Sequence, residues 1–86
     1  MGMKNVVLFT REGCCLCDQA REVLLTVQRR HPSTFQLREQ DIERDRRLHL
    51  AYLERIPVVS IDDEEAFEQF VDEAELERRL GIVGSG

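Results

Sequence analysis

Three cysteines lie within four residues, in the run Cys14-Cys15-Leu16-Cys17. Cys14 and Cys17 form a C-x-x-C pair between a short apolar run and an amphipathic segment, a pattern that predicts a strand followed by a helix. The first turn of a helix carries unpaired backbone N–H groups and partial positive charge, and both stabilise a thiolate. Because the thiolate is the nucleophilic form of cysteine, this placement predicts a dithiol that exchanges with disulfides.

The two cysteines of the pair are expected to have different roles because they occupy different depths of the helix. Cys14 lies at the helix end, where we expect it to be exposed and to attack a substrate disulfide. Cys17 lies one turn further in on the same face, where its sulfur can reach Cys14 and resolve the mixed disulfide. Arg11 adds positive charge that favours the Cys14 thiolate, whereas Asp18 opposes it slightly.

No cysteine occurs elsewhere in the chain, so the three cannot staple distant segments together. The cluster therefore indicates redox chemistry or metal binding rather than structural support. We interpret Cys15 as an ordinary thiol in the first helical turn. A role as an alternative redox partner, a glutathionylation site or a metal ligand stays open, although adjacent cysteines bridge only with strain.

The hydrophobic pattern predicts four strands and three helices that would position the cysteines. We expect strands over residues 5–10, 34–42, 58–61 and 65–69. Helices are expected over residues 15–30, over about 46–54 after an Asp45 cap, and after an Asp72 cap up to Gly81. Glu39 interrupts the alternation of the second strand, which predicts a bulge or an early end there.

Apolar spacing also predicts the buried face of each helix. The inward residues are expected to be Leu16, Ala20, Val23, Leu24 and Val27 in the first helix, Leu48, Ala51 and Tyr52 in the second, and Leu76 and Leu80 in the third.

The element order β-α-β-α-β-β-α predicts an α/β fold with a four-stranded mixed sheet and three helices on its two faces. The first strand–helix–strand unit implies parallel pairing, and the acidic turn at Asp62 and Asp63 implies an antiparallel hairpin. We expect a single domain over residues 4–81, with flexible ends at 1–3 and 82–86.

The charge balance argues against some classes of partner. Twelve basic and 17 acidic side chains give a formal net charge of −5, whereas a nucleic-acid binder needs a basic surface. No apolar run reaches the length of a membrane span, and residues 1–5 lack the features of a secretion signal. We therefore expect a cytoplasmic protein, acting as a monomer, with no nucleic acid or membrane as partner.

A second motif follows 40 residues after Cys17, where Pro57 opens the third strand in the segment R-I-P-V-V-S-I-D. Together with L-F-T-R-E-G-C-C-L-C and F-E-Q-F-V-D-E-A-E-L, this segment resembles the glutaredoxin-like family of small thioredoxin-fold proteins. The resemblance covers about residues 4–80.

The resemblance implies a thioredoxin-like fold and a disulfide reductase with Cys14 as nucleophile and Cys17 as resolving residue. It also implies that Pro57 is cis and faces these cysteines, and that Ile56 offers its backbone to an extended substrate. Arg11 matches the basic residue that glutaredoxins carry three positions before the nucleophile, where it can meet a glutathione carboxylate. No resident cofactor is expected, with glutathione as a candidate co-substrate.

The chain departs from glutaredoxins in ways that bear on its electron donor. Cys15-Leu16 stands where they usually carry Pro-Tyr, and their Gly-Gly pair near the last helix is absent. Asp72 could contact glutathione or serve only as a helix cap. The sequence thus leaves open whether glutathione or a protein reductase reduces the oxidised pair, and whether the substrate is a disulfide-bearing protein or a small thiol.

Two other functions fit the same cysteines. One is a site for zinc, copper(I) or an iron–sulfur cluster, for which three thiolates supply soft ligands but no fourth ligand is evident. The other is a thioredoxin-fold module without turnover, serving as a subunit or electron carrier of a larger reductase.

Overall fold

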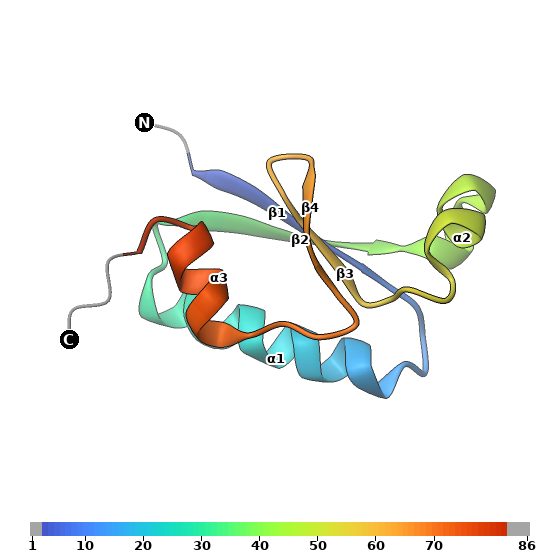
Figure 1. Ribbon diagram of the computed structural model, residues 1–86, viewed down its shortest axis with the longest axis horizontal. Coiled ribbons are helices and arrows are strands. Elements are labelled where there is room, and N and C mark those ends of the chain that lie inside the picture. Colours follow the sequence, from blue (N-terminus) through green and yellow to red (C-terminus); the bar gives the residue numbers. More distant parts are fainter. Residues whose placement is uncertain (1–2, 83–86) are drawn as a thin grey trace.

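The computed structural model describes residues 3–82, which form four strands, three α-helices and one 3-10 turn (Figure 1). In chain order these are β1 (Lys4–Thr10), α1 (Cys15–Arg30), β2 (Phe35–Asp41), η1 (Ile42–Arg44), α2 (Arg46–Tyr52), β3 (Val58–Ile61), β4 (Glu64–Glu68) and α3 (Glu73–Arg79). The predicted order of strands and α-helices is confirmed. Residues 1–2 and 83–86, which carry most of the expected flexible ends, lie outside the described residues, whereas Ile82 packs against the core.

The strands form one mixed sheet in the order β2-β1-β3-β4. β1 and β2 are parallel, as their helical connection requires, and β3 is antiparallel to both β1 and β4. Phe9 near the end of β1 is paired with Val58 at the start of β3. The segment that follows β1 and the segment that precedes β3 therefore meet at one end of the sheet, and they carry the cysteines and Pro57.

One face of the sheet is covered by α1 and α3, which lie together on one side of the strands in Figure 1. Burial of apolar side chains between these layers is the main stabilising contribution to the fold. The main buried cluster consists of Val6, Leu8, Ala20, Leu24, Val27, Phe35, Val59, Ile61, Val71, Leu76 and Leu80.

The prediction that Leu16 belongs to the buried stripe of α1 is wrong. Leu16 is 49% exposed, whereas Cys17 is fully buried. Residues three and four positions before Ala20 both lie near its face of the helix, so periodicity alone does not separate them. The sheet and the loops around it select Cys17, which leaves Leu16 at the surface between the two paired cysteines.

The predicted bulge or early end at Glu39 is also wrong. The β1–β2 register is unbroken from the Lys4–Phe35 pair to the Thr10–Asp41 pair. Glu39 lies beside α1, and its carboxylate accepts a hydrogen bond of 2.9 Å from the Arg21 guanidinium. A charged residue can occupy this strand position because the helix above supplies its partner.

The second face of the sheet is covered at one end by α2. The ring of Tyr52 stacks on Phe9 with centroids 4.6 Å apart. Asp45 caps α2 by accepting hydrogen bonds from the N–H groups of Arg47 and Leu48. Helices on both faces of the sheet are thereby confirmed. The expected inward position of Ala51 is wrong, because this residue is exposed. Only the side of α2 that carries Leu48 and Tyr52 contacts the buried cluster of Cys17, Ile42 and Ile56.

The C-terminal part follows the predicted turn and cap chemistry. Asp62 and Asp63 both have positive φ, 51° and 70°, as a two-residue hairpin turn between β3 and β4 requires. Asp72 caps α3 by accepting a hydrogen bond of 3.0 Å from the N–H of Glu75. Gly81, with φ of 79°, ends α3 in the left-handed conformation that favours glycine. None of the helices formed by residues 3–82 is long and apolar enough to cross a membrane.

Candidate active site

Cys14 lies at the junction of β1 and α1, where the chain must turn sharply. Gly13 has φ of 81°, a conformation that L side chains rarely adopt, and a Cβ there would meet no atom within 4 Å. The glycine is therefore required by backbone conformation and not by space. After this turn Cys14 becomes the N-cap of α1, and its Sγ accepts a hydrogen bond of 3.2 Å from the N–H of Cys17.

Cys14 and Cys17 are joined by a disulfide bond, with their Cα atoms 5.1 Å apart. Cys17 is fully buried, whereas Cys14 is partly exposed. A substrate from solution can therefore reach Cys14 but not Cys17. Cys15 is a free, exposed thiol outside this bond.

The loop before β3 carries the other two residues that the sequence singled out. The Ile56–Pro57 peptide bond is cis, and Pro57 is fully buried. The side chain of Ile56 is buried in the same apolar cluster as Cys17, against which Cys14 also packs. The backbone N–H of Ile56 donates to the carbonyl of Tyr52 at 3.0 Å.

Arg11 is exposed in the turn that precedes Gly13. No ion pair or hydrogen bond joins its side chain to Cys14 or to any other residue within 3–82. The tertiary structure thus brings together Cys14, Cys17 and Ile56, and it leaves the guanidinium of Arg11 in solvent.

Arg21 is a contributor to the site that sequence reasoning missed. It bonds both Asp18, at 2.8 Å, and Glu39, at 2.9 Å, and these hydrogen bonds raise the pKa of Arg21, with that to Glu39 contributing most. Asp18 is the acidic residue in the first turn of α1, beside the cysteine pair. Its charge is balanced by Arg21, so it opposes a Cys14 thiolate less than the sequence suggested.

Tyr52 and Arg55 also belong to the surroundings of the site. Tyr52 packs against the cluster of Cys17 and Ile56, and burial, together with the nearby Glu65 carboxylate, raises its pKa. The guanidinium of Arg55 lies 5.2 Å from the centre of the Tyr52 ring and forms ion pairs with Glu65 and Glu68. The inward position of Tyr52 was predictable from helical spacing, but nothing in the local sequence around Arg55 indicated its partners on β4.

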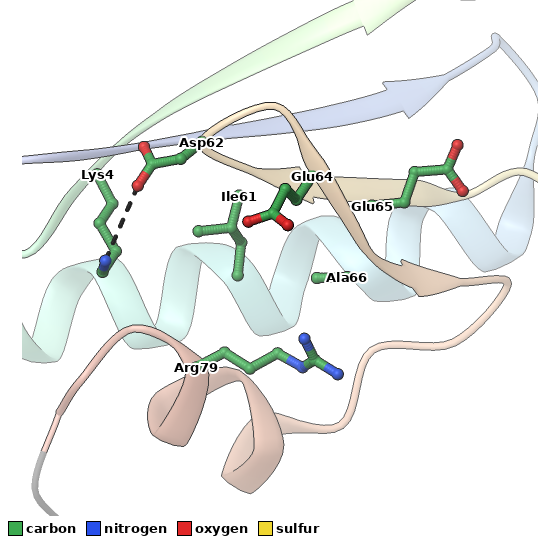
Figure 2. A pocket seen from close by; sticks show the side chains of 7 residues that line it. All are labelled: Lys4, Ile61, Asp62, Glu64, Glu65, Ala66 and Arg79. Atoms are coloured by element: carbon green, nitrogen blue, oxygen red, sulfur yellow. Dashed lines mark ion pairs between the residues drawn. The ribbon is translucent and has the colours of Figure 1, made fainter.

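A pocket of about 240 Å³ lies between the β3–β4 hairpin and α3, away from the cysteines (Figure 2). Lys4 and Asp62 form an ion pair of 3.8 Å at its edge, and Arg79 reaches toward it from α3. Lys4 begins β1 whereas Cys14 follows its end, so about 20 Å of strand separates the Lys4 edge of the pocket from the disulfide. This pocket does not belong to the dithiol site.

The family model of the glutaredoxin-like domain (DUF836) matches residues 5–81 of the chain. The chain belongs to this glutaredoxin-like family. Its curated relatives include the glutaredoxin-like protein YDR286C homolog of Dictyostelium discoideum, 29% identical over 76 residues, which covers 84% of this chain and 70% of the relative.

Solved structures show the same fold. The solution structure of protein Ne2328 from Nitrosomonas europaea superimposes with a TM-score of 0.76 at 27% identity, over 92% of this chain and 93% of that one. A thioredoxin mutant from Halobacterium salinarum gives a TM-score of 0.67 at 19% identity, over 92% of this chain and 73% of that one. This glutaredoxin-like chain therefore has a thioredoxin fold, and its Cys14–Cys17 pair supports a redox role.

Proposed function

We propose that this glutaredoxin-like protein is a thiol–disulfide oxidoreductase that reduces disulfides through Cys14 and Cys17. The main observation in support of this proposal is that the disulfide-bonded Cys14 and Cys17, at the N-terminus of α1, are buried to different extents. Cys14 is partly exposed and its sulfur accepts a hydrogen bond from a backbone N–H, and the same interaction stabilises a thiolate once the disulfide is reduced.

The reaction runs in two exchange steps that start from the reduced pair. The Cys14 thiolate attacks one sulfur of the substrate disulfide, forms a mixed disulfide and expels the other sulfur as a thiolate, which takes up a proton. Cys17 then loses its proton and attacks the Cys14 sulfur, which forms the Cys14–Cys17 bond and releases the second substrate thiolate. Two electrons pass from the dithiol to the substrate, and two thiols of glutathione or of a protein reductase restore the pair.

Ile56 supplies a hydrogen-bonding position for an extended substrate in this proposal. The N–H of Ile56 donates to the Tyr52 carbonyl, whereas no N–H within residues 3–82 donates to the Ile56 carbonyl. A peptide lying beside Cys14 can therefore donate a backbone N–H to the Ile56 carbonyl. The substrates that fit are protein disulfides and mixed disulfides of proteins with glutathione, handled by a monomer in the cytoplasm.

Single-cysteine variants test the proposal on a peptide that carries a glutathione mixed disulfide. Cys14→Ser is expected to abolish reduction, and Cys17→Ser to accumulate a covalent adduct that mass spectrometry detects. Cys15→Ser is the matched control and is expected to keep the wild-type rate, since Cys15 lies outside the bonded pair. Normal turnover by Cys14→Ser would exclude the proposal. Comparing glutathione with an NADPH-dependent protein reductase identifies the electron donor.

A further inference from the structure

The loop that presents Ile56 and Pro57 is fastened to the rest of the molecule by Gln69. The backbone N–H of Gln69 donates to the carbonyl of Pro57 at 2.6 Å, and its side-chain Nε2 donates to the carbonyl of Glu54 at 3.1 Å. These two carbonyls lie on either side of the Arg55–Ile56 segment. One residue from the β4–α3 turn thus holds the loop at both ends.

The backbone of Gln69 adopts an uncommon conformation to make these contacts. Its φ is 66°, in the left-handed region that favours glycine, and the N–H of Phe70 closes a three-residue turn by donating to the carbonyl of Glu68 at 2.8 Å. A non-glycine residue in such a conformation persists where surrounding contacts determine it. The contacts that do so here are the two hydrogen bonds to the loop.

The remaining attachments of the loop come from the same side of the sheet or from α2. Arg55 pairs with Glu65 and Glu68 of β4, and the N–H groups of Arg55 and Ile56 donate to the Tyr52 carbonyl at 2.8 and 3.0 Å. Gln69 also lines a small cavity with Leu16 and Phe70, which are 49% and 69% exposed. It therefore adjoins both the substrate-presenting loop and the surface around the helix of the dithiol.

We propose that Gln69 is a positioning residue of the dithiol site: it fixes the Glu54–Pro57 loop so that the Ile56 carbonyl is held ready for an extended substrate. The inference rests on the proposed disulfide reductase function. No hydrogen bond within residues 3–82 joins Gln69 to Cys14 or Cys17, so Gln69 acts through the position of Ile56. A backbone acceptor that is fixed before binding contributes more than one that must be ordered by the substrate.

Gln69→Glu tests the proposal because it keeps the size of the side chain and replaces the amide donor with an acceptor. We expect its KM for a peptide disulfide to rise roughly tenfold with kcat little changed, the loss expected for one hydrogen bond. For hydroxyethyl disulfide, which has no peptide N–H to donate to the Ile56 carbonyl, we expect both constants to stay within about twofold of wild type. Gln36→Glu is the matched control, since Gln36 is exposed on β2 and has the same charge change.

Gln69→Gly keeps the left-handed backbone and the N–H donor but removes the amide, so it separates the side-chain bond from any distortion of the turn. It should reproduce the selective rise in KM. An equal rise for both substrates, or no rise in either variant, would overturn the positioning role.

Amide hydrogen exchange gives a readout that does not depend on catalysis. In both Gln69 variants the Ile56 amide should exchange roughly tenfold faster while the Leu8 amide of β1 is unaffected. Unchanged Ile56 exchange in the variants overturns the inference even if the wild type reduces disulfides. If the wild-type protein reduces no disulfide but Ile56 exchanges faster in the variants, the result supports the role of Gln69 in fixing the loop. That result excludes only the proposed enzymatic function.

Discussion

The backbone N–H of Cys17 donates to the sulfur of Cys14 across 3.2 Å, at the residue where α1 begins. In the proposed reaction, Cys17 resolves the mixed disulfide and also stabilises the nucleophile, Cys14, through its main chain. Because a backbone group makes this contact, the contact survives substitution of the Cys17 side chain. The nucleophile should therefore remain reactive in a Cys17→Ser variant, which is why that variant should trap its substrate.

Cys14 should react as a thiolate at lower pH than an ordinary cysteine. In reduced Cys15→Ser protein, we expect the alkylation rate of Cys14 by iodoacetamide to reach half its maximum below pH ~8.5, the pKa of a free cysteine. The helix N-terminus and the Cys17 N–H are the physical causes. Peptide mapping locates the alkylated residue. A midpoint at or above that value would mean that the helix terminus does not activate Cys14.

Two leucines of α1 offer a matched test of the core. Leu24→Ala should lower the free energy of unfolding by about 2–5 kcal/mol, since the side chain is fully buried between α1 and the sheet. Leu16→Ala should lower it by less than about 1 kcal/mol, because Leu16 is 49% exposed. Urea unfolding of the disulfide-bonded protein measures both. Equal losses of stability in the two variants would contradict the exposed position of Leu16.

Tyr52 should make stability depend on alkaline pH. Burial raises the pKa of Tyr52, so the folded protein favours the neutral phenol. The stability that this preference contributes is complete below the ordinary tyrosine pKa of about 10. It is lost as the pH rises through the higher pKa of Tyr52 in the folded protein. Tyr52 is the only tyrosine in the chain, so tyrosinate absorbance follows this residue alone. We expect its titration midpoint above about 10. Tyr52→Phe, which retains the stacked ring on Phe9, should remove this part of the alkaline destabilisation.

Asp72 should behave as a helix cap. Asp72→Ala removes the acceptor for the Glu75 N–H and should lower the free energy of unfolding by about 0.5–2 kcal/mol. Asp72→Asn keeps an acceptor oxygen and should stay close to wild type in thermal and urea unfolding. If Asp72→Asn weakened binding of glutathione while leaving stability intact, the carboxylate would have a second role beyond the cap.

Much of the fold follows from local patterns in the sequence. The strands, helices, hairpin and caps were predictable because hydrophobic periodicity, turn residues and capping residues depend on only a few neighbouring positions. The errors concern positions that local patterns leave undecided. The alternation of residues predicts a break at Glu39, because the sequence does not show that Arg21 of α1 pairs with it. Helical spacing likewise predicts that Ala51 faces inward, because the sequence does not show how much of α2 contacts the core.

The sequence by itself identified the candidate redox chemistry of this protein: a C-x-x-C pair at a strand–helix junction, with a proline opening a later buried strand. Only the tertiary structure decided which groups surround that chemistry. It buried Cys17 rather than Leu16, left Arg11 in solvent, balanced Asp18 with Arg21, and brought Gln69 to the loop of Ile56. The reason is that spacing along the chain fixes which face or turn a residue occupies, whereas its partners come from segments that only the packed sheet brings alongside.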